Sequence, residues 1–366
     1  MKDAFDYQLS YSGKVPVRKV LTTPARGSWT PEMPQENPSH LFCFGDNLQG
    51  MAHLLPRYKG SVDLIYIDPP FGTGQDFSRP NEAVAYTDPV LDATFLEFIR
   101  QRLLFLREFL SPKGSIYLHI DKKAGHYLKI LMDEVFGQQN FLNDISRIKC
   151  NPKNFRRKAY GNFSDMILFY AKERDQHIWR PQKEALKGEE VKRLFPRLDK
   201  KEGPYTTHPL HAPGETKDGD TGKIWKGLKP PPGRHWRYSR KVLDELDKKG
   251  MIEWSNSGNP RKKVFARNHK GKKIQDVWEF KDRGLSYVSY PTEKNHRMLQ
   301  RLILQSSLPE SLVMDIFAGS GSFLVQAAKM GRYTLGMDQS PKALSTISDH
   351  FTKENLDLAI HRHQPS

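Results

Sequence analysis

LVMDIFAGSGSFLVQAAK, residues 312–329, is the stretch that decides the fold. Leu312 to Phe317 is an almost continuous apolar run, as expected for a strand that is covered on both faces. Ala318-Gly-Ser-Gly-Ser322 then forms a glycine turn, and residues 323–329 have the spacing of a helix, with Gly331 beyond it. A strand, a glycine turn and a helix in this order are typical of a Rossmann-type fold, which brings backbone close to a nucleoside.

The next strand, residues 333–338, ends on Asp338, nineteen residues after Gly319. A carboxylate at this spacing can accept hydrogen bonds from both hydroxyls of a ribose. The turn lacks the third glycine of the dinucleotide fingerprint and the Lys-Ser/Thr of a P-loop, which disfavours a pyrophosphate cradle and an NAD-dependent reductase. S-adenosylmethionine has no phosphate, so it fits better. An ordinary tight turn is the structural alternative.

Strand and helix signals alternate through much of the remaining chain, which predicts an α/β, doubly wound and mainly parallel sheet. Thr94-Phe-Leu-Glu97 has the spacing of a capping box, and Ser340-Pro341 is expected to start the last helix. Strands are expected at residues 41–44, 62–67, 115–120 and 166–170, and helices at residues 94–110, 128–136 and 297–304.

Four regions follow from these signals: residues 1–40 as an arm lying on the body or partly disordered, 41–171, 172–284 and 285–366. Residues 147–283 contain 35 Lys and Arg against 18 Asp and Glu, which is essentially the whole net charge of +16. This charge favours a polyanionic partner. Trp225, Trp236, Trp254 and Trp278 indicate that the basic region folds, as an irregular insertion.

VDLIYIDPPF, residues 62–71, is a buried strand that ends on a carboxylate, two prolines and a ring. Parallel sheets place ligands at such a strand end, and Pro69 and Pro70 fix φ and remove two N–H donors. Asp68 and the Pro69 carbonyl then form a pair of acceptors beside Phe71. Such a pair suits the exocyclic amino group of a flat base stacked on Phe71. From these residues alone, an acidic turn with Phe71 in the core is about equally supported.

Other features exclude several classes of protein. Cys43 and Cys150 provide no disulfide framework and no cysteine metal site, and His208-Pro-Leu-His211 has no third ligand, so no metal is expected. No apolar run approaches the length of a membrane span, and the first residues lack a secretory apolar segment. The expectation is a soluble cytoplasmic protein.

At these motifs the chain resembles the β class of DNA amino-methyltransferases, in which the catalytic motif precedes the target-recognition region and the cofactor motif follows it. Asp68-Pro-Pro-Phe71 is similar to the catalytic motif, and Asp315-Ile-Phe-Ala-Gly-Ser-Gly321 to the cofactor loop. Tyr290-Pro-Thr-Glu-Lys-Asn295 resembles the segment before that loop, and Gly45-Asp-Asn47 resembles a turn whose acid contacts the cofactor adenine. The likeness covers roughly residues 41–171 and 277–350. The opening half also resembles modification subunits of type III restriction systems.

The resemblance implies that residues 41–171 and 285–366 are the catalytic and cofactor-binding halves of one methyltransferase domain, and that residues 172–284 recognise the target. It implies catalytic roles for Asp68, Pro69, Pro70 and Phe71. It implies S-adenosylmethionine contacts from Asp46, Asn47, Asp68, Thr292, Lys294, Asp315, Phe317, Gly319, Ser320, Gly321, Ser322 and Asp338.

The Asp-Pro-Pro-Phe form of the motif implies adenine N6 as the target, whereas Ser-Pro-Pro-Tyr/Trp is usual for cytosine N4. The family commonly has Gln-Lys-Pro where this chain has Glu293-Lys294-Asn295, and often has Glu in the place of Asp338. The expected function is therefore site-specific adenine-N6 methylation. Cytosine-N4 or RNA amino-methylation, and a non-catalytic nucleic-acid-binding role, are the alternatives.

The resemblance also implies partners. These are double-stranded DNA, a second copy of the chain in a homodimer, and a companion restriction endonuclease, in the cytoplasm of a prokaryote. An enzyme without a companion nuclease is the alternative.

Overall fold

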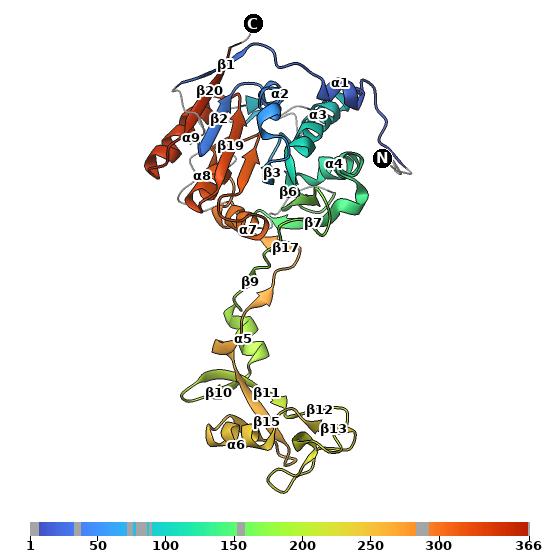
Figure 1. The fold of residues 1–366 in the computed structure, drawn as a ribbon, viewed down its shortest axis with the longest axis vertical. Coiled ribbons are helices and arrows are strands. Elements are labelled where there is room, and N and C mark those ends of the chain that lie inside the picture. The colour runs from blue at the N-terminus through green and yellow to red at the C-terminus, as the bar shows by residue number, and fades with distance from the viewer. Residues whose placement is uncertain are drawn as a thin grey trace. The chain divides into compact units, whose positions relative to one another are not determined.

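The computed structural model describes residues 7–32, 38–71, 76–77, 86–87, 90–151, 158–282 and 293–364. The chain divides into two compact units. Met1–Gln182 and Gln275–Ser366 form the larger unit, and Lys183–Ile274 form the smaller one (Figure 1). The larger unit is therefore discontinuous in sequence, with the smaller one as an insertion.

The larger unit is built on a sheet that has ten strands among the described residues. Six adjacent strands, from β20 to β6, are mutually parallel, β17 is parallel to β7, and β1 and β8 run antiparallel to their neighbours. The order across the sheet is β1 (Ser28–Pro31), β20 (Ala359–Gln364), β2 (His40–Phe44), β19 (Tyr333–Asp338), β18 (Leu312–Asp315), β3 (Val62–Ile67), β6 (Leu110–Ile120), β8 (Ser164–Ala171), β7 (Phe141–Ile148) and β17 (Val277–Glu279). This mainly parallel α/β sheet confirms the predicted fold class.

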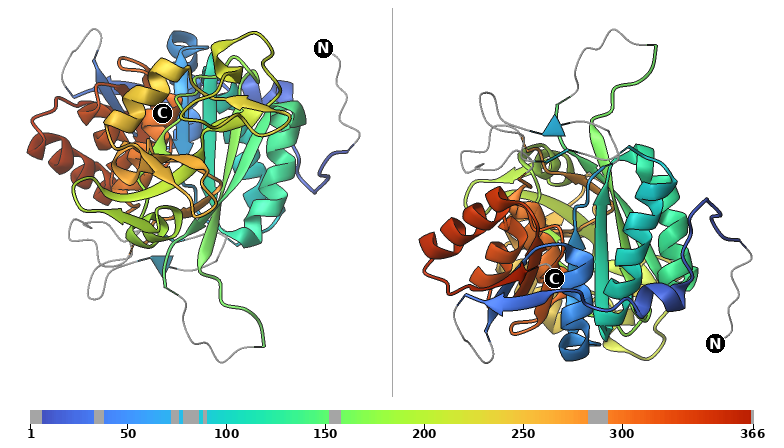
Figure 2. Two further views of the ribbon diagram at one scale, coloured as in Figure 1. Left: turned by 90° about the horizontal axis from the view of Figure 1, so that it is seen from below. Right: turned by 90° about the horizontal axis from the view of Figure 1, so that it is seen from above.

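Two groups of helices cover the two faces of the sheet (Figure 2). One group contains α2 (Asn47–Tyr58), α3 (Ala93–Phe109) and α4 (Lys122–Phe136), and the other contains α7 (His296–Ser306), α8 (Ser322–Lys329) and α9 (Pro341–Lys353). Within the described part of the chain, no helix combines the length and the apolar character that crossing a bilayer requires.

The start of α3 corrects one prediction from the sequence. The Asp92 carboxylate, and not the Thr94 hydroxyl, caps the helix by accepting a hydrogen bond of 2.8 Å from the Phe95 N–H. Aspartate and threonine are both good N-cap residues, and here the helix starts from Asp92. The predicted capping box at Thr94 is wrong because the chain enters the helix at Asp92.

The N-terminal segment of the larger unit, residues 7–32, lies against α3 and α4 and along the edge of the sheet. The hydroxyl of Tyr7 donates to Asp133 at 3.1 Å, and that of Tyr11 donates to Glu97 at 2.7 Å. A short helix, α1 (Val17–Leu21), follows, and β1 then adds a strand at the edge of the sheet. These contacts show how an extended, proline-rich segment is held without a core of its own.

The smaller unit is more regular than the irregular insertion that the sequence predicted. It contains a four-stranded antiparallel sheet in the order β10 (Arg197–Asp199), β11 (Gly203–Pro209), β15 (Pro260–Phe265) and β14 (Ile252–Trp254). Further elements are α5 (Gly188–Leu194), α6 (Arg240–Lys248), the pair β12 (His211–Pro213) and β13 (Arg234–Trp236), and the pair β9 (Lys183–Glu184) and β16 (Lys272–Lys273).

Trp225 and Trp236 belong to the small core of this unit, together with Leu210, Leu243 and Ile252. Trp254 is 42% exposed and stacks on Trp225 with a ring-centroid distance of 5.8 Å. Burial of large aromatic rings can stabilise a unit that has few aliphatic residues.

A buried carboxylate joins three strands of the larger sheet at the end opposite to the predicted site. Asp63, on β3, accepts hydrogen bonds of 2.7 Å from the hydroxyls of Ser111 and Ser311, and Lys113 lies 3.7 Å from it. Ser111 is on β6, and Ser311 precedes β18. Because Asp63 is 6% exposed, its loss would leave two buried hydroxyls without their acceptor.

We expect Asp63→Ala to lower the free energy of unfolding by about 2–4 kcal/mol, because two hydrogen bonds to a charged group are lost. Urea denaturation followed by circular dichroism measures this change. Asp349→Ala, at an exposed position of α9, is the matched control and should change stability by less than about 0.5 kcal/mol. Equal stabilities of the two variants would contradict the proposed role of Asp63 in joining the three strands.

Candidate active site

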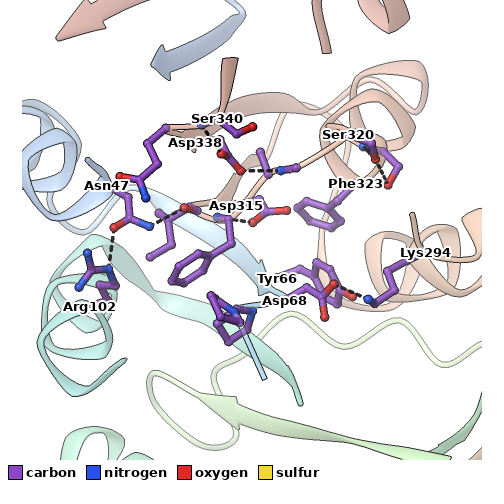
Figure 3. A pocket seen from close by; sticks show the side chains of 18 of the residues that line it. Asn47, Tyr66, Asp68, Arg102, Lys294, Asp315, Ser320, Phe323, Asp338 and Ser340 are labelled. Carbon is purple, nitrogen blue, oxygen red and sulfur yellow. Dashed lines mark hydrogen bonds and ion pairs between the residues drawn. The ribbon is translucent and has the colours of Figure 1, made fainter. Parts of the chain in front are cut away.

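A cavity of about 570 Å³ lies where four neighbouring parallel strands end (Figure 3). Its walls include residues at or directly after the ends of β2, β3, β18 and β19, together with side chains from the neighbouring helices. In open α/β sheets, ligands bind at the carboxyl ends of the strands. The position of the cavity is therefore the one that the fold leads us to expect for a binding site.

The structure brings most of the predicted site residues together around this cavity. Gly321 is in the glycine turn but is not part of the lining, and Thr292 lies outside the described residues. The predicted residues that line the cavity are Asp46, Asn47, Asp68, Pro69, Pro70, Phe71, Lys294, Asp315, Phe317, Gly319, Ser320, Ser322 and Asp338. Segments about 250 residues apart in sequence thus share one cavity.

The glycine turn is locked to the end of β19. The Gly319 N–H donates to one carboxylate oxygen of Asp338, and the Ser340 N–H donates to the other, each at 2.9 Å. Gly321 has a φ of +71°, and a Cβ atom there would lie 2.4 Å from Ile347. A side chain at Gly321 is therefore excluded both by the backbone conformation and by the neighbouring helix.

Asp338 is half-buried, and burial raises the pKa of its carboxyl group above the ordinary value. The backbone N–H groups of the turn act in the opposite direction, because they stabilise the carboxylate. Burial also raises the pKa of Asp315 well above the ordinary value, and the Phe317 N–H donates to Asp315 at 2.9 Å.

Asn47 and Arg102 connect the turn after β2 to the loop after β18. The Asn47 side-chain amide donates to the Ile316 carbonyl at 2.8 Å and accepts from Arg102 Nε at 2.6 Å. Arg102 also lies 3.3 Å from Asp46 and stacks over the Phe98 ring at 3.5 Å. Burial lowers the pKa of Arg102 to about 10.

Arg102 was not among the site residues predicted from the sequence, although a signal for it exists. Arg102 lies three residues after Ile99, so it falls on the apolar stripe of α3 and is 5% exposed. A basic residue on a buried stripe must have a partner. Here the partners are the polar groups of Asp46 and Asn47.

The Asp-Pro-Pro-Phe segment begins where β3 ends, and the Asp68 carboxylate faces the Lys294 ammonium (Figure 3). Lys294 Nζ is 2.5 Å from Asp68 Oδ2 and 5.4 Å from the centre of the Phe71 ring. His119 Nδ1 is 3.8 Å from Asp68 Oδ1. Oδ1 is buried and has no hydrogen-bond partner among the described residues.

A second polar layer, also missed from the sequence, lies behind Asp68. His119 is fully buried on β6; its Nδ1 is 2.9 Å from the Tyr66 hydroxyl, and its Nε2 is 3.3 Å from Asp165. Asp165, on β8, also contacts Lys149 Nζ at 2.5 Å. A histidine within an otherwise apolar strand was the available signal, because buried polar groups need partners.

The lining fits S-adenosylmethionine better than a phosphate-containing cofactor. Asp46, Asp68, Asp315 and Asp338 line the cavity, and the basic residues of its described lining, Arg102 and Lys294, each face one of these carboxylates. A cavity with this excess of acidic over basic side chains favours a cationic sulfonium and an amino group over a pyrophosphate. Among the residues that the structure describes, no group of three His, Cys, Asp or Glu is arranged to hold a metal ion.

Comparisons with known proteins show the family to which the chain belongs. The sequence model of the DNA methylase family matches residues 62–349. The type II methyltransferase M.EcaI of Enterobacter cloacae is 40% identical over 314 residues, which cover 85% of this chain and 69% of that protein. The StyLTI Mod subunit, from a type III restriction-modification enzyme of Salmonella typhimurium, is 26% identical over 366 residues and covers 86% of this chain. This chain spans 55% of the StyLTI Mod subunit.

Solved structures with a similar arrangement include the complex of M1.HpyAVI with SAM. It has a TM-score of 0.47 and 13% identity, and the match covers 85% of this chain and 98% of that one. The family match spans both motif segments, and the catalytic motif precedes the cofactor loop, which is the β-class order. The chain therefore belongs to the DNA methylase family, as a β-class, S-adenosylmethionine-dependent DNA amino-methyltransferase of the restriction-modification type.

Proposed function

We propose that the chain methylates N6 of an adenine that is rotated out of double-stranded DNA, and that it is the modification enzyme of a restriction-modification system. The observation that carries this proposal is the shared cavity of Asp68 and the glycine turn. The Asp-Pro-Pro-Phe form of the motif supports adenine over cytosine. M.EcaI and the StyLTI Mod subunit, by their names, support the restriction-modification setting.

The chemical difficulty is that the lone pair of an adenine amino group is delocalised into the ring. S-adenosylmethionine, when bound, supplies a methyl group that is electrophilic because its sulfur is positively charged. Asp68 and the carbonyl of Pro69 would accept the two amino protons, which favours a pyramidal nitrogen and directs its lone pair. Phe71 would stack on the base. Asp68 thus acts mainly as an acceptor that positions the amino group.

Lys294 has a defined place in this proposal. Its ammonium is 2.5 Å from Asp68 and lies over Phe71, so it occupies the side of the carboxylate that faces the cavity. The amino group of the base must therefore share Asp68 with Lys294 or displace it. We therefore assign Lys294 two roles, one at the catalytic Asp68 and one in cofactor binding.

The smaller unit is proposed to hold the DNA. Residues 183–274 contain 24 Lys and Arg against 12 Asp and Glu. Rotating a base out of the duplex costs a few kcal/mol, of which stacking on an aromatic ring returns about 1–3 kcal/mol. Phosphate contacts from the basic unit would supply much of the remainder.

A homodimer and a companion endonuclease remain predictions from the resemblance, and light scattering on the purified protein would test the first.

Asp68→Ala should lower the single-turnover rate of methyl transfer by on the order of a thousandfold, because a preorganised acceptor is lost. The assay uses unmethylated plasmid DNA and labelled S-adenosylmethionine, followed by nucleoside mass spectrometry. N6-methyladenine is the expected product of the unmodified chain. N4-methylcytosine would overturn the choice of base. Asp144→Ala, at an exposed position of β7, is the control and should retain the full rate.

DNA binding should weaken steeply with salt, because each phosphate contact releases a counterion. With six or more contacts, affinity should fall by roughly a thousandfold or more between about 50 and 200 mM salt. Fluorescence anisotropy with a labelled duplex measures this dependence. S-adenosylmethionine affinity over the same salt series serves as the control for an intact fold. A DNA affinity that changes less than about threefold would argue against the proposed role of the basic unit.

A further inference from the structure

One oxygen of Asp68 faces a nitrogen and forms no hydrogen bond. Asp68 Oδ2 contacts Lys294, whereas Oδ1 is buried, has no hydrogen-bond partner among the described residues and lies 3.8 Å from His119 Nδ1. Buried polar atoms in folded proteins almost always have partners. Asp68 Oδ1 is one of eight exceptions among the described residues, and it belongs to the carboxylate that is proposed to receive the amino protons.

The surroundings of His119 determine which of its nitrogens carries the proton. Interactions with His119 and Lys149 lower the pKa of Asp165 far below the ordinary value, despite its burial, so Asp165 is a carboxylate and requires a donor from Nε2. Burial lowers the pKa of His119, so the ring is neutral at pH 7. Nδ1 is then an acceptor, and the Tyr66 hydroxyl, which burial keeps protonated by raising its pKa, donates to it.

Two acceptors therefore face each other, Asp68 Oδ1 and His119 Nδ1, with no hydrogen between them. This explains why the pair is 3.8 Å apart and forms no hydrogen bond. One additional proton would convert the contact into a charge-assisted hydrogen bond. Methylation of an amino group releases one proton for each turnover.

Resting on the proposed function, we propose that His119 is a positioning residue that accepts, through Asp68, the proton released by the target amino group. The amino nitrogen forms a bond to the methyl carbon while the bond from that carbon to sulfur breaks, and the electron pair stays on sulfur. The nitrogen, now positively charged, loses one proton to the Asp68 carboxylate. A rotation about the Cβ–Cγ bond of Asp68 turns the protonated oxygen toward His119 Nδ1, and the Tyr66 hydroxyl turns its hydrogen away from that nitrogen. Nδ1 then takes the proton on its one lone pair, and Asp68 is again a carboxylate.

Other charged groups around His119 decide whether it can hold this proton. From β8, Asp165 favours the imidazolium, and from the end of β3 Asp68 does the same. Lys294 and Arg147 oppose it. Arg147, however, lies 3.6 Å from Asp165 and is ion-paired with Asp282, and Lys149 also contacts Asp165. The Asp165 carboxylate would form the direct ion pair with the imidazolium, through His119 Nε2.

The first test observes the histidine without turnover. Protein labelled with ¹⁵N-histidine is titrated by NMR, and the His119 signal is assigned by its absence from His119→Gln. We expect a neutral ring with the proton on Nε2 at pH 7. Tyr66→Phe removes the donor to Nδ1 and should move the His119 titration to higher pH, because the neutral ring loses a hydrogen bond. A proton on Nδ1 at pH 7 would overturn the proposal.

The second test follows the single-turnover rate against pH. The rate should fall as pH decreases through the titration of His119, because a protonated ring cannot accept another proton. His119→Gln should lower the rate on the order of 100-fold and lose this dependence, with unchanged affinity for S-adenosylmethionine. Tyr66→Phe should move the dependence to higher pH by the same amount as the NMR titration.

His40→Gln is the matched control, a half-buried histidine on β2 that contacts Thr334 outside the cavity lining; it should leave the rate and its pH dependence unchanged. A His119→Gln variant with the rate and pH dependence of the unmodified chain would overturn the proposal. If this variant does not fold, a shift in Tyr66→Phe supports the proposal and an unmoved profile overturns it. If the unmodified chain methylates no DNA, the proposed function is contradicted. The protonation state of His119 is then still decided by the NMR titration.

Discussion

The parallel pairing of β2, β19, β18 and β3 is the constraint on which the rest of the site depends. These strands are direct neighbours, and each ends at the same edge of the sheet. Their pairing places Asp68 after β3, the glycine turn after β18 and Asp338 after β19. A slip in register would turn the side chains at these ends to the opposite face. The hydrogen bonds that Asp63 accepts from Ser111 and Ser311, at the other end of β3, help to fix this register.

The motif residues and the fold class could be predicted because their signals are local. The run of residues 312–329 contains a strand, a turn and a helix in sequence, and glycine at position 321 is required by a positive φ and by contact with Ile347. The strand at residues 62–67 is uniformly buried, as its apolar run predicted. In these segments, local preference and tertiary structure agree, which is typical of a well-specified fold.

The residues that the sequence did not reveal act through partners far away in the chain. His119 is recognisable as a buried histidine, but its partners Tyr66 and Asp165 are 53 and 46 residues away. The strands of the smaller unit were missed for another reason. Most residues of β11 and β15 are half-exposed; β11 is largely polar, and β15 contains Arg261, Lys262 and Lys263, so neither strand has an apolar run. Their pairing with each other, and not their composition, defines them as strands.

The smaller unit leaves and rejoins the chain through two short strands that pair with each other. In this pairing Lys183 lies opposite Lys273, so the two ends of the insertion are one strand spacing apart. An insertion whose ends are adjacent can be replaced without changing the distance that the host must span. Under the proposed DNA-binding role of this unit, exchange of residues 183–274 as one segment would change the target sequence and leave the residues of the cavity in place.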